Sequence, residues 1–182
     1  MKGNRAVLTA VVVLVLIIAG WWLFKRKSGG EPIDLIATLA TAEKRPPEGQ
    51  LEVVEVDLNG DKKRAIFTVP ATRITWKMTI PDDAWLKVSL ATKQETWEKE
   101  GDGVLFRIGV SDGRAFEDLI TQHVDPYNNK GDRRWIPLNV DLSAYAGEHV
   151  EVILNTNTSP KGKGDDRRND TALWGEPEIV IR

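Results

Sequence analysis

The chain has 182 residues, no cysteine and a formal net charge of −2. The lack of cysteine excludes disulfides and thiolate metal sites. Residues 50–182 hold eighteen lysines and arginines against twenty-three aspartates and glutamates, so this part is acidic and offers no broad basic surface for nucleic acid. The length fits one domain preceded by an anchor.

The first expected element is a transmembrane helix over residues 6–24. These nineteen residues carry no charge, and Thr9 is their one polar side chain. A helix of this length spans roughly 28 Å, close to the hydrocarbon thickness of a bilayer. A short flank, residues 1–5, precedes it. Aromatic and basic residues at the end of the span and just beyond it are expected at the membrane interface: Trp21, Trp22, Lys25, Arg26 and Lys27.

Two alternatives concern this segment. Lys2 and Arg5 followed by an apolar run also fit a cleaved signal peptide, but the run ends in bulky residues where a signal peptidase requires small ones. The basic residues on the two flanks nearly balance, so the positive-inside rule alone does not fix the orientation. The signal-anchor pattern favours a single-pass protein of the bacterial inner membrane with a periplasmic C-terminal domain.

The segment between the span and the domain, residues 25–49, begins with a basic collar and a Ser-Gly-Gly joint. Pro32 suits the first turn of a helix, and apolar residues recur from there at helical spacing: Ile33, Ile36, Leu39 and Ala40. This pattern predicts a short amphipathic helix over residues 32–44 that lies on a membrane or on a partner. The alternative is a linker with incidental apolar residues.

From Leu51 the apolar residues alternate with a period of two, as in half-buried strands. Nine short strands are expected, over residues 51–58, 64–70, 72–80, 84–91, 104–111, 115–124, 135–142, 149–158 and 172–182. In the third strand, Ile74, Trp76 and Met78 share one face, which we expect to point into the core. Short, evenly spaced strands with almost no helix predict an antiparallel β-sandwich over residues 50–182.

The second half of this domain resembles a known superfold. The stretches GDGVLFRIGVSDG from Gly101, WIPLNVDLSAYAGEHVEVILNT from Trp135 and ALWGEPEIV from Ala172 are similar to the jelly-roll domains of galactose-binding-like proteins and carbohydrate-binding modules. The resemblance implies an all-β, antiparallel jelly-roll β-sandwich located outside the cytoplasm. It is compatible with sugar binding, protein binding or a structural role, because this fold hosts all three.

The resemblance also implies a structural calcium ion, for which four residues of one loop offer suitable oxygens: Asp165, Asp166, Asn169 and Asp170. Basic residues share that loop and neutralise it, so a solvated loop is the alternative, and we predict no bound metal or other cofactor. The two histidines, His123 and His149, lie in different expected strands with no nearby partner of a catalytic triad. We therefore expect no enzymatic activity.

Trp97 lies among charged residues in QETWEKE and outside any expected strand, so we expect it to be exposed. An exposed tryptophan can stack on a sugar ring or dock a protein partner, and both interpretations stay open. The other tryptophans of the domain fit strand positions and are predicted to be core residues: Trp76, Trp85, Trp135 and Trp174.

The anchor, the small sandwich and the lack of a catalytic constellation favour a non-catalytic accessory or structural subunit of a multiprotein membrane complex, such as a photosynthetic or respiratory assembly. Its partners would be the membrane and integral membrane proteins, and the sandwich would brace the complex outside the bilayer. The alternative is a surface-anchored carbohydrate-binding module whose ligand is a glycan.

Overall fold

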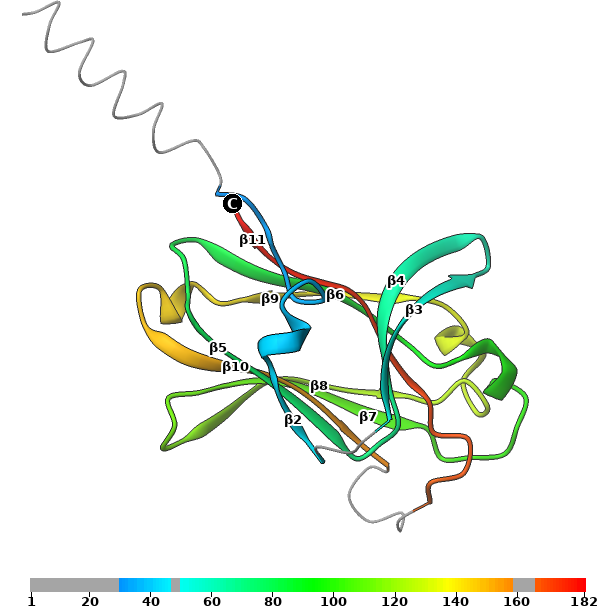
Figure 1. Cartoon of the computed structure of the whole chain (residues 1–182). Coiled ribbons are helices and arrows are strands. Elements are labelled where there is room, and N and C mark those ends of the chain that lie inside the picture. The colour runs from blue at the N-terminus through cyan, green and yellow to red at the C-terminus, as the bar shows by residue number, and fades with distance from the viewer. Residues whose placement is uncertain (1–29, 47–49, 159–165) are drawn as a thin grey trace, which may run out of the picture. The chain divides into compact units, whose positions relative to one another are not determined.

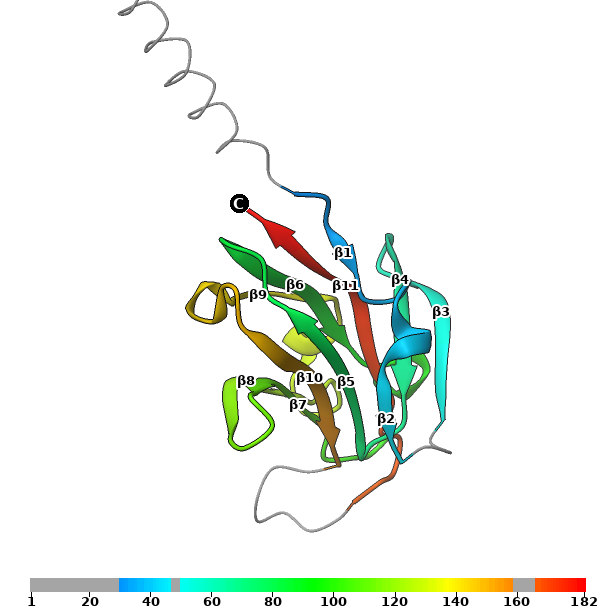
Figure 2. The same cartoon turned by 60° about the vertical axis from the view of Figure 1, so that its left-hand side comes forward.

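A computed structural model describes residues 30–46, 50–158 and 166–182 of the protein. Two antiparallel β-sheets packed face to face form this part of the chain (Figure 1). Residues Pro32–Arg182 make up one compact unit. Figure 2 shows the two layers of strands from a second side. The prediction of an all-β sandwich of antiparallel strands is confirmed, because every strand pairing in both sheets is antiparallel.

The six-stranded sheet has the order β3-β4-β11-β6-β9, with β1 also paired to β11. Its strands are β1 (Ile33–Asp34), β3 (Leu51–Leu58), β4 (Asp61–Thr68), β6 (Ala84–Ala91), β9 (Ile136–Asp141) and β11 (Ala172–Ile181). The five-stranded sheet has the order β2-β5-β10-β7-β8. Its strands are β2 (Glu43–Arg45), β5 (Thr72–Thr79), β7 (Val104–Ser111), β8 (Phe116–Val124) and β10 (His149–Asn157).

The described parts of the connections between strands contain four single-turn 3₁₀ helices. These are η1 (Leu39–Thr41), η2 (Gln94–Thr96), η3 (Lys130–Asp132) and η4 (Ser143–Tyr145). All nine strands expected from Leu51 onward are present, and their ends differ from the predicted ends by at most three residues. Alternating apolar residues therefore locate the strands reliably in this chain, since each strand buries one face in the sandwich.

The main core lies between the sheets. Ile74 and Trp76 of β5 are buried and Met78 packs against them, so the predicted inward face of this strand is confirmed. From the opposite sheet, Trp174 meets Phe106 edge to face, with ring centroids 4.9 Å apart. Edge-to-face pairs of this kind are favoured by the charge distribution of the rings, so this contact helps to fix how the two sheets pack.

The prediction of an amphipathic helix over residues 32–44 is wrong. This segment forms β1, a turn with η1, and β2. Because β1 pairs with the six-stranded sheet and β2 with the five-stranded sheet, the segment bridges the two layers. Its apolar residues enter the main core: Leu35, Ile36, Leu39 and Ala42. The Asp34 carboxylate stabilises the turn by accepting hydrogen bonds from the backbone N–H groups of Ile36 and Ala37, at 2.7 and 3.1 Å.

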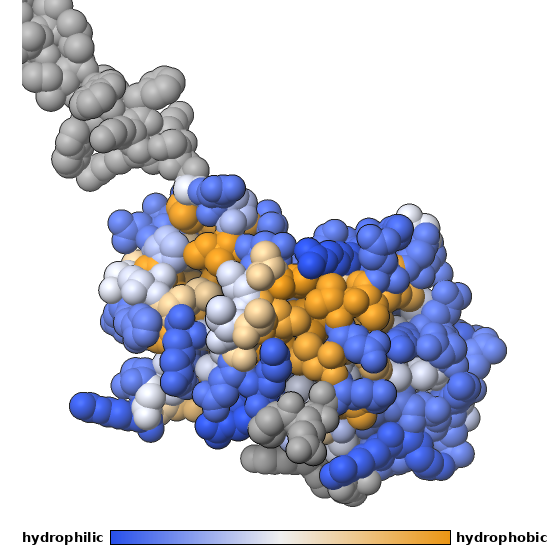
Figure 3. All heavy atoms as spheres, in the orientation of Figure 1, coloured by the Kyte–Doolittle hydropathy of each residue, from blue (hydrophilic) through white to orange (hydrophobic). Residues whose placement is uncertain are grey.

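Apolar side chains also gather on this side of the molecule (Figure 3). Ile33 and Leu51 pack against the main core, and Val53 of the edge strand β3 is exposed. The apolar residues of the segment 32–44 therefore recur at a helical spacing because they cover one side of the sandwich core, and not because they form a helix.

The predicted localisation in a membrane is contradicted. No helix among the described residues is long and apolar enough to cross a bilayer. The predicted span, residues 6–24, lies outside the described part of the chain. The five predicted interface residues lie outside it as well: Trp21, Trp22, Lys25, Arg26 and Lys27.

Candidate functional site

The outer face of the six-stranded sheet carries a second, smaller core. On β4 and β11, Ile66 and Trp174 point into the main core, so the residues next to them point outward. These outward residues cluster with two tryptophans from the loops that follow β6 and β8. The cluster consists of Leu58, Ala65, Phe67, Ala91, Trp97, Trp135 and Leu173.

The prediction of an exposed Trp97 is wrong, because its side chain is only 6% exposed. Its indole Nε1 donates a hydrogen bond to the carbonyl oxygen of Thr92 at 3.2 Å. The guanidinium of Arg133 donates to the carbonyl oxygen of Trp97 at 3.0 Å and so ties the two loops together. A ring packed in this way offers no free face to a sugar.

The outer face of the five-stranded sheet is different, because it carries a row of polar side chains. Arg73, Asn155 and Arg107 are direct neighbours on β5, β10 and β7. The row continues to Arg45 on β2 and Thr121 on β8. The residues next in sequence to four members of the row pack in the main core: Ile74, Leu154, Phe106 and Ile120. Since paired residues of neighbouring strands project to the same side, the row points outward. We call these five residues the arginine row.

An aromatic ring lies beside this row. Phe116 of β8 is 37% exposed, and its ring rests on Gly109 of β7, where a Cβ would come within 2.5 Å of ring atoms Cε2 and Cζ. The guanidinium carbons of Arg107 and Arg73 lie 5.4 and 5.8 Å from the ring centroid. We call this ring with the arginine row the Phe116 face. It combines a half-exposed apolar ring with hydrogen-bond donors held by rigid strands.

The charges on the Phe116 face are unequally compensated. Arg107 forms a two-pronged ion pair with Asp118, in which its Nε lies 3.0 Å from Oδ1 and its Nη2 contacts Oδ2. Arg45 is paired with Glu43, with its Nη2 at 2.7 Å from the carboxylate. Arg73 makes no ion pair with any described residue and contacts the Phe116 ring instead. The face therefore retains one guanidinium whose charge is not balanced locally.

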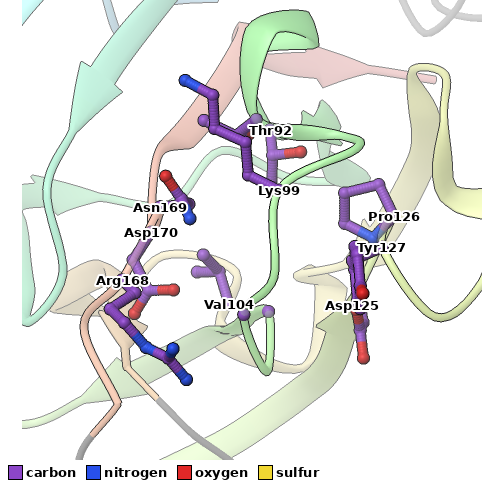
Figure 4. A pocket seen from close by; sticks show the side chains of 12 residues that line it. Thr92, Lys99, Val104, Asp125, Pro126, Tyr127, Arg168, Asn169 and Asp170 are labelled. Carbon is purple, nitrogen blue, oxygen red and sulfur yellow. The ribbon is translucent and has the colours of Figure 1, made fainter.

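A second candidate site is a pocket between loops at one end of the sandwich (Figure 4). Its volume is about 20 Å³, enough for roughly one water molecule. Tyr127 lies at this pocket and is 43% exposed. Lys99, Arg168 and Asp170 also line it. A monosaccharide does not fit inside such a volume, although it can lie across the opening.

The predicted calcium ligands do not form a ligand set in the described part of the loop. Asp165 lies outside the described residues. Asp166 accepts hydrogen bonds from the guanidinium of Arg168, with Nη2 at 2.7 Å, and these bonds lower the pKa of its carboxyl group to about 2. Asn169 uses its amide to donate to the carbonyl oxygen of Glu100 at 2.9 Å. Asp170 is buried beside the pocket.

No group of three acidic or histidine side chains that would suit a metal ion occurs among the described residues. The two cations beside the pocket, Lys99 and Arg168, also oppose a divalent ion there. Calcium binding by this loop therefore stays a prediction.

Asp102 lies next to this loop and has both carboxylate oxygens buried without a hydrogen-bond partner. Its charge is compensated from a distance by Arg168. Asp166 is the main cause of the raised pKa of the Arg168 guanidinium, through its hydrogen bond and its charge, and Glu100 and Asp102 raise that pKa further.

The histidines do not form a catalytic group in the structure. Nε2 of His123 lies 2.7 Å from the carbonyl oxygen of Asp102, and Nδ1 of His149 lies 3.4 Å from the hydroxyl of Thr79. The two rings stand on different strands of the five-stranded sheet, β8 and β10. Among these contacts, neither ring pairs with both a nucleophile and a carboxylate, which a triad requires.

Comparison with known proteins places the fold in context. No protein-family model matches the chain. A protein of uncharacterised function from Archaeoglobus fulgidus is 35% identical over 142 residues, which are 74% of this chain and 34% of that protein. This chain therefore spans about a third of the length of that relative.

Several solved carbohydrate-binding modules have similar structures. CBM51 from Clostridium perfringens GH95, in complex with methyl-galactose, matches with a TM-score of 0.53 and 16% identity, over 82% of this chain and 99% of that one. TmCBM61, in complex with β-1,4-galactotriose, matches with a TM-score of 0.51 and 9% identity, over 82% and 94% of the two chains.

The CBM22-2 xylan-binding domain of Paenibacillus barcinonensis Xyn10C gives a TM-score of 0.53 and 9% identity, over 84% of this chain and 99% of that one. At such low identity the likeness establishes the fold alone.

The sequence analysis missed the Phe116 face. One signal was present, because Arg73, Arg107 and Asn155 occupy the polar positions of alternating strands. Their assembly depends on the pairing of Asn155 with Arg73, 82 positions away, and with Arg107, 48 positions away, which alternation within a strand does not reveal. What the comparisons establish is that the matched part of this chain, 82% to 84% of it, has the β-sandwich fold that these carbohydrate-binding modules share.

Proposed function

We propose that this protein is a non-catalytic carbohydrate-binding module with a jelly-roll sandwich, and that it binds a glycan on the Phe116 face. One observation carries the proposal. The Phe116 ring lies on Gly109 at the surface of a rigid sheet, half exposed and flanked by two arginines. A pyranose ring has an apolar face of C–H groups that stacks on such an aromatic ring, while its hydroxyls require nearby polar groups for orientation.

The strand framework supports this assignment. Phe116, Gly109 and Asn155 come from three adjacent strands of one sheet, so their spacing is set by backbone hydrogen bonds. A binding surface on strands is more rigid than one on loops, which reduces the entropy lost on binding. The loop pocket is the weaker candidate because its volume admits only about one water molecule.

The solved modules of similar fold support the same function, because their ligands are sugars: methyl-galactose and β-1,4-galactotriose. No such support exists for a subunit of a membrane complex. The binding of a glycan requires no catalytic group, and the contacts of the two histidines described above do not form one.

A glycan array probed with the full-length protein tests the proposal. We expect binding to a defined set of glycans and a loss of at least about tenfold in affinity in Phe116→Ala, because the stacking surface is removed. Tyr127→Ala is the matched control, since Tyr127 is the exposed aromatic residue of the loop pocket.

Loss of binding in Tyr127→Ala with none in Phe116→Ala would move the site to the loop pocket. Absence of binding to every glycan on the array would refute carbohydrate binding altogether.

A further inference from the structure

The arginine row crosses all five strands of the sheet on its outer side. Its members are Arg45, Arg73, Asn155, Arg107 and Thr121. Three arginines in one row are unexpected in a domain whose residues 50–182 carry five more acidic than basic side chains, twenty-three against eighteen. The row therefore places three guanidinium groups on the sheet face that also carries the exposed Phe116 ring.

The ion pairs along the row leave one cation available. Glu43 compensates Arg45, and Asp118 compensates Arg107. Arg73 has no carboxylate partner among the described residues, and its guanidinium carbon lies 5.8 Å from the centre of the Phe116 ring. A guanidinium left in this state is weakly hydrated and has a planar fork of donors that matches a carboxylate.

Asn155 supplies a polar group next to this cation. It stands between Arg73 and Arg107 and is only 7% exposed. No hydrogen bond among the described residues uses its side-chain amide. The polar atoms of this amide are not fully enclosed, so they can hydrogen-bond to a hydroxyl group of a bound ligand.

The distances suit a single acidic sugar ring. Neighbouring strands are about 4.8 Å apart, so Arg73 and Arg107, two strands apart, lie about 10 Å from each other at their Cα atoms. The Phe116 ring centre lies within 5.8 Å of both guanidinium carbons. A sugar stacked on this ring would have a carboxylate at its edge within reach of Arg73 and a hydroxyl within reach of Asn155.

We propose that the Phe116 face selects hexuronates, with Arg73 binding the carboxylate, Asn155 a hydroxyl and Phe116 the C–H face of the ring. This inference rests on the proposed function, since it names the class of sugar that the same site takes. Arg107 acts as a positioning residue, because Asp118 holds its guanidinium beside the aromatic ring.

Matched ligands separate charge from shape. Full-length protein is titrated with oligogalacturonate, oligoguluronate and glucuronate oligosaccharides, and with the methyl ester of each, which keeps the ring and removes the charge. We expect at least one acid to bind at least about tenfold more tightly than its ester, and this preference to shrink as ionic strength rises. Heparin fragments and other sulfated glycans form a second arm, which tests whether any anion suffices.

Two matched arginine variants test which guanidinium binds the carboxylate of the sugar. Arg73→Gln should reduce the affinity for the acid at least about tenfold and leave the ester unchanged, because only the carboxylate contact is removed. Arg64→Gln removes the same charge from β4 of the six-stranded sheet, outside the Phe116 face, where the guanidinium is paired with Asp34, so we expect a change below about threefold. Thermal unfolding midpoints of both variants check that the fold is intact.

The outcomes distinguish this inference from the proposed function. Equal binding of the acids and their esters, with both lost in Phe116→Ala, would overturn hexuronate selection and leave glycan binding intact. Sulfated glycans that bind as tightly as hexuronates, and equally lose affinity in Arg73→Gln, would also overturn it, since the site would then recognise only charge. Absence of binding to neutral and acidic glycans alike would refute the proposed function itself.

Discussion

The outer faces of the two sheets each carry an aromatic ring packed on a glycine, but one ring is buried and the other is exposed. On each, a strand glycine makes room for an aromatic ring that lies on the sheet. Trp135 lies over Gly175 of the six-stranded sheet and is 5% exposed, whereas Phe116 lies over Gly109 of the five-stranded sheet and is 37% exposed. The comparison indicates that a ring lying on a sheet becomes part of a core or stays exposed according to what else covers it.

The loops decide this outcome. The loops after β6 and β8 both fold onto the six-stranded sheet, where they bring Trp97 and Trp135 into one apolar cluster. The Nε1 of Trp135 donates to the carbonyl oxygen of Asp61 at 2.9 Å, which satisfies its polar group inside the cluster. Phe116 is instead the first residue of the strand β8 itself, directly after the short connection from β7, and its ring lies near Arg73 and Arg107.

The largest expected effect concerns the outer face of the six-stranded sheet, which the loops that carry Trp97 and Trp135 cover. Trp135→Ala should lower the free energy of unfolding by about 3–5 kcal/mol, because a buried aromatic ring is deleted from a packed cluster. Chemical denaturation monitored by circular dichroism measures this loss. A loss below about 1 kcal/mol would mean that Trp135 does not close the face, and the contrast with Phe116 would disappear.

Gly175→Ala tests whether the ring requires the glycine. The added Cβ would lie 2.8 Å from Cζ3 of Trp135, so we expect a loss of about 1–3 kcal/mol from overpacking. The same substitution in a Trp135→Ala background should cost clearly less, because the clashing atom is gone. Strictly additive losses in the double variant would show that the strain arises from the backbone instead.

On the outer face of the five-stranded sheet, Phe116→Ala should lower the free energy of unfolding by only about 1 kcal/mol, since the ring is far from fully buried. Comparison of its denaturation midpoint with that of Trp135→Ala measures the contrast between the faces directly. Equal losses in the two variants would indicate that Phe116 is a structural residue, and the binding proposal would lose its main support.

The smallest expected effect concerns β8, the edge strand of the five-stranded sheet. The Tyr145 hydroxyl of η4 donates to the Glu117 carboxylate of β8 at 2.7 Å, and burial together with this bond raises the pKa of Tyr145 to about 12. The folded protein therefore keeps the phenolic proton to a higher pH than the unfolded chain, whose tyrosine pKa is near 10. Stability should fall as pH rises from about 10 to about 12.

Denaturation midpoints measured across this range test the effect. In Tyr145→Phe this part of the pH dependence should vanish, because the titrating group is removed. A Tyr145→Phe variant that keeps the full decline would assign it to another residue.

The strand pattern was predictable because each strand buries one face and exposes the other. Trp76 and Ile74 were placed inward from alternation alone, and both are buried. The same reasoning failed for residues 32–44, whose spacing fits a helix but whose apolar residues serve two sheets in turn. It failed again for Trp97, because charged neighbours in sequence say little about which sheet a loop folds onto.

The sequence by itself determined the all-β sandwich, because a period of two in burial is a local property of each strand. It also determined which residues of each strand are polar. Only the tertiary structure decided that Arg73, Asn155 and Arg107 stand in one row and that Phe116 lies beside them, because strand register links residues far apart in the chain. The physical reason is that pairing partners are chosen by the packing of the whole sandwich, and not by the segments that carry them.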